Sequence, residues 1–342
     1  MAASIDKIVV VTRPTALDEL VERHSTRAQA RFYVRARAVA ALAEPRVSQS
    51  GNIDPIDVDE LRDIEDAAFA EYQGAHDAYQ AALSSLRRAL PAEPRAQFID
   101  REFLPTFTFG PDDLVVTVGP DGLLVNTAKY LQGQPLLALN PDRTRIDGVL
   151  VSFDISHAAG ALRQALRGEL QTRSVSMAQA ALDDGQRLLA LNDLFIGQRS
   201  HISARYRLRF RSREENQSSS GVIVSTGAGS TGWLRSILAG ASGIVEAFTG
   251  EGTARAARNS YRFDWEADEL YFSVREPFES NVSSASLVFG RIEAGEKLQI
   301  ESQMPQDGVV FSDGIQEDRL EFNSGAIAAV GLADQKVNLL VP

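Results

Sequence analysis

Glycine, serine and threonine crowd the stretch from Ser219 to Trp233, which reads Ser-Ser-Gly-Val-Ile-Val-Ser-Thr-Gly-Ala-Gly-Ser-Thr-Gly-Trp. Its apolar part, Gly221 to Val224, predicts a short buried strand, and the residues from about Trp233 onward predict a helix. Glycine allows positive φ and close backbone approach, and a helix N-terminus offers unpaired N–H groups. Such a turn suits phosphate or ribose oxygens, but the same hydroxyls also serve as ordinary helix caps. The residues alone leave both interpretations open.

Gly227, Gly229 and Gly232 also match the Gly-x-Gly-x-x-Gly fingerprint of dinucleotide-binding dehydrogenases. That motif requires a βαβ unit with an acidic residue about 20 positions later, at the end of the second strand. Here the segment 249–253 reads Thr-Gly-Glu-Gly-Thr, and no apolar strand leads into its Glu. The fingerprint is therefore set aside.

A second candidate for chemistry is Asp121, in the tetrapeptide Gly-Pro-Asp-Gly at 119–122. The preceding run, Leu114 to Val118, predicts a buried strand, and Leu123 to Leu131 predicts a helix. A carboxylate at the carboxyl end of a parallel strand lies where open α/β sheets bind ligands. Pro-Asp-Gly is also ordinary turn chemistry, and the residues alone favour Asp121 as a helix cap.

The composition of the chain restricts which functions and ligands are expected. The 342 residues suffice for two domains, and 35 basic against 46 acidic side chains give a net charge of −11. This acidic balance argues against nucleic-acid and anionic-membrane partners. The absence of cysteine excludes disulfides and Cys-ligated zinc, and the histidines show no metal-ligand spacing, so we expect no metal-ligating residue. With neither a signal-peptide pattern nor an apolar run of about 18 residues, we expect a cytoplasmic protein.

The N-terminal part alternates strands and helices, which predicts an α/β, Rossmann-like domain over residues 1–147. A helical insertion at about 57–90 carries apolar residues at spacings of three and four. It is either an arm, a helical hairpin or a packing surface for a partner, or a helix that lies on its own domain. Strands are expected at 7–12, 114–118, 135–139 and 149–153, and helices at 16–23, 26–42, 57–90, 123–131 and 158–170.

The remainder predicts a β-rich, β-sandwich-like domain over residues 148–325. Asp-Asp-Gly at 183–185, between the runs 172–181 and 187–196, is a strong hairpin signal. The apolar tail 326–342 is expected to pack back on the first domain. Further strands are expected at 202–210, 269–274, 286–289, 298–301, 309–312 and 320–322.

In order and spacing, these pieces resemble the motifs of NAD kinases. Gly119 to Gly122 resembles their Gly-Gly-Asp-Gly-Thr motif, and Ser225 to Thr231 their Ser-Thr-x-x-Gly-Ser-Thr loop. Between them, Asn140-Pro-Asp-Arg with Gly148 resembles an Asn-rich turn, and Asn192-Asp193 an Asn-Glu motif. Ser219-Ser-Gly, Phe272 to Pro277 and Asp313-Gly look closest to the mitochondrial-type branch. The resemblance covers about 114–330, and the helix at 57–90 lies outside it.

The resemblance implies the NAD kinase/diacylglycerol kinase-like fold and a specific reaction. ATP, or polyphosphate in some members, phosphorylates the 2′-hydroxyl of the adenosine ribose of NAD(H), with Mg²⁺ accompanying ATP. Asp121 is then the base that accepts the hydroxyl proton, and homo-oligomers are usual. The implied NAD- and nucleotide-binding residues are Gly119, Gly122, Asn140, Asn192, Asp193, Thr226, Gly229, Ser230, Thr231, Gly232 and Trp233, with Arg275 as a weaker candidate.

Two departures from the family motif keep other functions open. Pro120 replaces the second glycine and removes an N–H donor, and Leu123 replaces the threonine. These changes fall where the donor triphosphate is expected. One alternative is a non-catalytic protein that binds NAD on the kinase scaffold. Another is a sugar or lipid kinase of the same superfamily, since a fold does not fix the acceptor.

Overall fold

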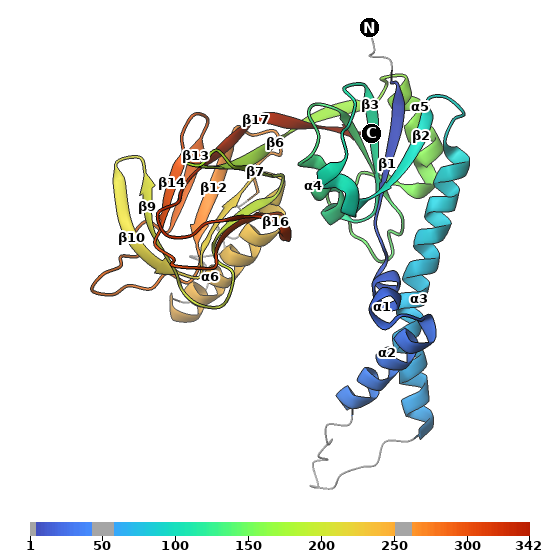
Figure 1. The fold of residues 1–342 in the computed structure, drawn as a ribbon, viewed down its shortest axis with the longest axis horizontal. Helices are drawn as coiled ribbons and strands as arrows, with labels where there is room; N and C mark the ends of the chain where they lie inside the picture. The colour runs from blue at the N-terminus through green and yellow to red at the C-terminus, as the bar shows by residue number, and fades with distance from the viewer. Residues whose placement is uncertain (1–4, 43–57, 250–261) are drawn as a thin grey trace.

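The computed structural model describes residues 5–42, 58–249 and 262–342, and the side chains of 39–42 and 58–66 are not described. The chain forms an α/β lobe, a β-rich lobe and a helical arm below the α/β lobe (Figure 1). In the α/β lobe, parallel strands follow the order β2-β1-β3-β4. Their bounds are β1 Lys7–Thr12, β2 Arg95–Asp100, β3 Asp113–Val118 and β4 Pro135–Asn140.

Helices cover both faces of this parallel sheet. Side chains alternate along β1, so Ile8 and Val10 face one layer and Val9 and Val11 face the other. The first layer holds α3 (Val58–Ala89) and α5 (Ala158–Leu166), and the second holds α4 (Asp121–Ala128) and the 3₁₀ turn η1 (Arg101–Thr106). The apolar runs expected to be buried strands are therefore buried on both faces.

The long helix α3 has two halves with different neighbours. Its C-terminal half packs on the sheet through Tyr79, Leu83 and Leu86, which are nearly or fully buried. Its N-terminal half runs beside α2 (Arg27–Leu42) as a helical hairpin that projects away from the lobe (Figure 1). Between β1 and α2, helix α1 (Ala16–His24) begins with a capping box formed by Thr15 and Asp18. One half of α3 thus forms a helical hairpin and the other lies on its own domain, whereas packing on a partner remains a prediction.

The β-rich lobe consists of two sheets packed face to face. One sheet contains β6 (Gln171–Leu182), β7 (Arg187–Ala190), β9 (Ala204–Phe210), β10 (Arg213–Ser219) and β14 (Leu298–Ser302). The other follows the order β13-β12-β11-β8-β15-β16. Its bounds are β8 Asp193–Gln198, β11 Val222–Ser225, β12 Glu269–Val274, β13 Phe289–Glu293, β15 Gly308–Ser312 and β16 Ile315–Glu321. A shared core that includes Tyr206, Phe272 and Phe322 fills the space between them.

The C-terminal tail joins the two lobes. It forms β17 (Ile327–Val341), which pairs antiparallel with β14 and β6 and parallel with β4, where Asn338 lies opposite Pro135. One sheet therefore runs from the α/β lobe into the β-rich lobe (Figure 1). The expected fold class, an α/β part followed by a β-rich part, is confirmed. The division at residues 147 and 325 remains a prediction.

Four expected strands differ from the structure. The expected strand 149–153 is reduced to β5 (Phe153–Asp154), because the N–H groups of Val149 and Leu150 bind the Asp121 carboxylate instead of a strand. The run 187–196 divides into β7 and β8, which belong to different sheets. The expected strand 286–289 begins only at Phe289, and residues 320–321 of the expected strand 320–322 belong to the longer β16. The edge strands β2 and β10 were not expected. None of the described helices combines the length and apolarity needed to cross a bilayer.

Candidate functional site

Three loops meet at the turn of residues 191–193, whose backbone is held by the Asp313 carboxylate. They follow β7 (residues 191–192), β11 (226–231) and β15 (313–314). Oδ1 of Asp313 accepts N–H bonds from Asn192 at 2.7 Å and Asp193 at 3.2 Å, and Oδ2 accepts one from Leu191 at 3.2 Å. This one side chain thus holds the backbone of the Asn-Asp turn. The sequence motif contained Asp313, but no role had been assigned to it.

The threonine and serine hydroxyls of the glycine-rich loop fasten it to that turn. The Thr226 N–H donates to the carbonyl of Asn192 at 2.9 Å, and Thr226 Oγ1 donates to the carbonyl of Leu191 at 2.5 Å. The same oxygen accepts the N–H of Gly229 at 3.1 Å. Ser230 Oγ donates to the carbonyl of Gly227 at 2.7 Å. Thr226 and Ser230 therefore use their hydroxyls inside the protein, where they shape the loop.

The glycines of this loop are required by neighbouring backbone. A Cβ on Gly229 would lie 2.2 Å from the carbonyl oxygen of Asn192, and one on Gly227 would lie 2.0 Å from that of Asp264. Neither these residues nor Gly232 has a positive φ, so the loop uses the close backbone approach that glycine permits and not its left-handed conformation. Their small size lets three segments of the same chain pack backbone to backbone.

Two buried acceptors at the same place lack a donor. Among the described residues, Oδ1 of Asn192 and Oδ1 of Asp193 have no hydrogen-bond partner, and Asp193 is only 8% exposed. Leaving a buried acceptor unsatisfied costs about 1–3 kcal/mol. A ligand that presents an amino group or a hydroxyl would satisfy both oxygens. The site is built to receive hydrogen-bond donors.

The two carboxylates of this site have raised pKa values. The pKa of Asp193 is raised to about 7, mainly by burial and also by the nearby Asp313, against a hydrogen bond with Ser225 that lowers it. Burial also raises the pKa of Asp313 to about 6, opposed by its backbone N–H donors and by Lys129. Both carboxyl groups therefore titrate at a higher pH than an exposed aspartate.

Trp233 begins helix α6 (Trp233–Thr249) directly after the 3₁₀ turn η3 (Gly229–Thr231), so the helix start is confirmed. Its ring stacks on Phe195 at 5.8 Å between centroids and 7° between planes. The Arg275 guanidinium lies 5.2 Å from the Trp233 centroid. Trp233 therefore anchors α6 on the second sheet.

Asp121 belongs to a second group, at the carboxyl end of β3. It is the first residue of α4, and its two carboxylate oxygens accept the N–H groups of Val149 at 2.9 Å and Leu150 at 3.0 Å. The preceding residue, Pro120, is the N-cap and contributes no capping side chain. A Cβ on Gly122 would meet no atom within 4 Å, whereas one on Gly119 would meet Leu123 at 2.9 Å. The surface at Gly122 is therefore open to a ligand.

Asn140, at the end of β4, organises the neighbouring loop. Its Nδ2 donates to the carbonyl of Ile146 at 2.8 Å, and its Oδ1 accepts the N–H of Asp142 at 2.9 Å. Gly148 lies against the same amide with φ at +59°, a conformation that favours glycine. Asn140 is fully buried and both of its amide atoms are used inside the protein. Its contribution is to hold the loop that binds Asp121.

The two groups are joined through α4. Leu123 and Leu124 of this helix share a core with Leu191 and Ala228, which flank the Asn-Asp turn and the glycine-rich loop. Among the described residues, no hydrogen bond joins Asp121 or Asn140 directly to the Asn192 group. The described residues also hold no set of three or more His, Asp or Glu side chains arranged for a metal ion.

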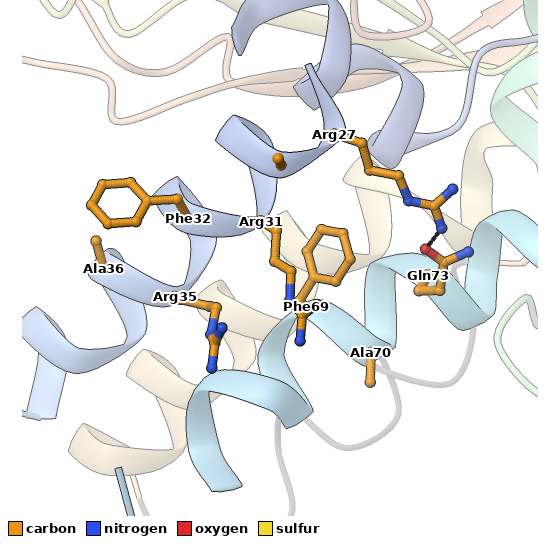
Figure 2. A pocket seen from close by; sticks show the side chains of 9 residues that line it. Arg27, Arg31, Phe32, Arg35, Ala36, Phe69, Ala70 and Gln73 are labelled. Carbon is orange, nitrogen blue, oxygen red and sulfur yellow. Dashed lines mark hydrogen bonds between the residues drawn. The ribbon is translucent and has the colours of Figure 1, made fainter. Parts of the chain in front are cut away.

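A large cavity lies far from both groups, between α2 and α3 in the arm (Figure 2). Its volume is about 880 Å³. Arg31 lies over the ring of Phe69 at 5.7 Å, and Arg27 donates to Gln73 across the hairpin. The lining arginines are thus engaged in contacts within the arm, and none of the predicted site residues lines this cavity.

The sequence matches no protein-family model and no curated protein. The fold is similar to that of yeast NADH kinase complexed with NADH, at 15% identity and a TM-score of 0.53, covering 78% of this chain and 80% of that one. It is also similar to an NAD kinase from Archaeoglobus fulgidus in complex with ATP, at 17% identity and a TM-score of 0.50, covering 76% and 88%. The chain therefore has the NAD kinase-like fold.

Proposed function

We propose that this protein is an NAD(H) kinase that transfers the γ-phosphoryl group of ATP to the 2′-hydroxyl of the adenosine ribose. The observation that carries the proposal is the pair of unsatisfied acceptors on Asn192 and Asp193. Adenosine offers the matching donors, an amino group on the base and hydroxyls on the ribose. The two similar structures, which contain NADH and ATP, support this choice of ligands.

In this proposal the Asn192 group binds the adenosine and the Asp121 group takes part in the phosphoryl transfer. The turn at Asn192 and Asp193 holds the adenosine, and Asp121 accepts the proton of the 2′-hydroxyl as its oxygen attacks the γ-phosphorus. The new O–P bond forms while the bond to the β-phosphate oxygen breaks, and ADP leaves. Each Asp121 oxygen accepts one backbone N–H and retains a further lone pair for that proton. Gly122, which is open to solvent, lets the nucleotide approach the helix.

A non-catalytic NAD-binding protein is the second candidate, and two observations favour it. Leu123 is 3% exposed and packs in the core, so it offers no hydroxyl to a phosphate. Asp121 also has a structural task, because it binds the N–H groups of Val149 and Leu150. A protein that keeps the adenosine site but lacks the donor site would bind NAD without turnover.

The test is a coupled assay of NADP formation with purified protein, NAD, MgATP and, in a parallel arm, polyphosphate. Asp121→Asn is compared with Asp100→Asn, which changes the carboxylate at the end of the neighbouring strand β2 and can retain its cap on the Glu102 N–H. The kinase proposal predicts NADP from the wild type and from Asp100→Asn, and at least about 100-fold less from Asp121→Asn. NAD binding without NADP formation would favour the binding protein, and ATP consumption independent of NAD a kinase with another acceptor.

Homo-oligomerisation and a cytoplasmic location remain predictions from the sequence. The apolar residues Ile244, Val245 and Phe248 on α6 are 62%, 40% and 87% exposed in the single chain. Burial of such a cluster against a second copy would stabilise an oligomer. Light scattering after gel filtration tests the oligomeric state.

A further inference from the structure

Lys129 is a buried charge that bridges the two lobes. Its side chain is only 4% exposed, and its Nζ donates to Asp318 Oδ2 at 2.5 Å and to Ser312 Oγ at 3.0 Å. Lys129 ends α4, the helix that begins with Asp121, whereas Ser312 and Asp318 belong to β15 and β16 of the β-rich lobe. One ammonium group therefore connects the helix that carries Asp121 to the lobe that carries the turn at Asn192 and Asp193.

Stability alone does not explain this lysine. A buried ion pair is often no more stabilising than apolar side chains of similar volume, because both charges lose their hydration. Around Lys129 most of the helix is buried, and Leu124, Val125 and Ala128 pack in the core. Apolar residues in place of both Lys129 and Asp318 would hold the helix about equally well. We therefore expect the positive charge of Lys129 to have a role beyond stability.

That charge lies next to Asp313 along the chain, because the Nζ of Lys129 binds the hydroxyl of Ser312, and Asp313 follows directly after β15. Burial raises the pKa of Asp313, and the N–H donors of residues 191–193 and the charge of Lys129 both lower it. Asp193 of β8 also faces Asp313, and the two carboxylates repel each other. The partner of Lys129, Asp318, lies near Tyr130, whose pKa is raised to about 12 by burial and by Asp318. Lys129 thus adds a positive charge to the N–H groups that oppose the effect of burial on Asp313.

The charge on Asp313 matters because that carboxylate accepts three N–H bonds from residues 191–193. Protonation of Asp313 would weaken its oxygens as acceptors and place a hydrogen atom opposite N–H groups that can only donate. We propose that Lys129 is a positioning residue that keeps the Asp313 carboxylate ionised and thereby holds the turn at Asn192 and Asp193 in the geometry that binds NAD. This inference rests on the proposed function.

Calorimetric titration of NAD between about pH 5.5 and pH 8.5 tests it, with Lys129→Met, Lys129→Arg and Asp318→Asn beside the wild type. Near pH 7, Lys129→Met should bind NAD at least about 10-fold more weakly, because without the charge of Lys129 more of Asp313 is protonated and the turn that it holds is loosened. As the pH is lowered, the NAD affinity of Lys129→Met should begin to fall at a higher pH than that of the wild type. Lys129→Arg should restore the wild-type pH profile. Asp318→Asn is the matched control, because it removes the ion pair but leaves the charge of Lys129 beside Asp313.

Each outcome decides the inference. A folded Lys129→Met protein with wild-type affinity and pH profile would overturn it, and so would a shift in Asp318→Asn as large as that in Lys129→Met. If Lys129→Met does not unfold cooperatively, the double variant Lys129→Met/Asp318→Leu replaces it, with the same expected loss and shift. Failure of the wild type to bind NAD at any pH would instead refute the proposed function, and the inference would fall with it.

Discussion

Replacing Asp193 by asparagine is expected to stabilise the protein in a pH-dependent way. Burial raises the pKa of Asp193 from 3.8 to about 7, so the folded protein holds this proton more tightly than the unfolded chain. The contribution of this carboxyl group to stability is therefore complete below about pH 4 and is lost as the pH rises through about 7. Asparagine has no proton to lose and can donate a hydrogen bond toward Asp313. The variant escapes the cost of burying a charge.

The magnitude follows from the shift. About three pKa units, at about 1.4 kcal/mol per unit, give an upper value of about 4 kcal/mol for Asp193. Because Asp193 and Asp313 titrate as a coupled pair, we expect the free energy of unfolding to rise by about 2–4 kcal/mol near pH 8. Near pH 4.5 the difference from the wild type should fall to about 1 kcal/mol. A functional residue that lowers stability is common at binding sites.

Urea unfolding followed by circular dichroism and tryptophan fluorescence, near pH 4.5, 6.5 and 8, measures this effect. Asp184→Asn is a control of opposite sign, because hydrogen bonds from Gln186 lower the pKa of the exposed Asp184. It should show no gain in stability near pH 8. The reasoning is refuted if Asp193→Asn is as stable as the wild type, or less stable, near pH 8.

Further predictions concern the glycines, the arm and self-association. Gly229→Ala should lower both stability and NAD affinity, since its Cβ would lie 2.2 Å from a backbone oxygen. Gly122→Ala should weaken nucleotide binding at an unchanged melting temperature. Calorimetry measures the affinities and thermal melts measure the stabilities. Leu86→Ala should cost about 2–5 kcal/mol in urea unfolding because the side chain is fully buried, while Phe32→Ala, at a site 74% exposed, should change stability by less than about 0.5 kcal/mol. Phe248→Ser should shift light-scattering mass toward the monomer if α6 forms the expected contact between copies; an unchanged mass would exclude α6 from that contact.

Much of the fold could be predicted because its interior strands and helices are encoded locally. The apolar runs of β1 and β3 and the apolar stripe along α3 are each visible within one stretch of sequence. The edge strands β2 and β10 were missed because their exposed sides carry polar residues, as in Arg-Glu-Glu-Asn-Gln-Ser-Ser of β10. An edge strand pairs on one side only, so little of it needs to be apolar.

The site was harder to predict because its key contacts join distant parts of the chain. Val149 and Leu150 look like strand residues, and only the position of Asp121, 28 and 29 residues earlier, shows where their N–H groups bind. Asp313 holds a turn 120 to 122 residues before it. Lys129 meets Asp318 across 189 residues, and its only local signal is a lysine in an apolar helix of a chain where lysine is scarce.

The most direct test of the account is calorimetric titration of NAD into the wild type and into Asn192→Ala. The account predicts that the wild type binds NAD and that adenosine alone competes for the site, because the unsatisfied oxygens of Asn192 and Asp193 receive the adenosine donors. Asn192→Ala should bind at least about 10-fold more weakly, at an unchanged melting temperature. A wild-type protein that binds neither NAD nor adenosine, or an Asn192→Ala variant with wild-type affinity, would contradict it.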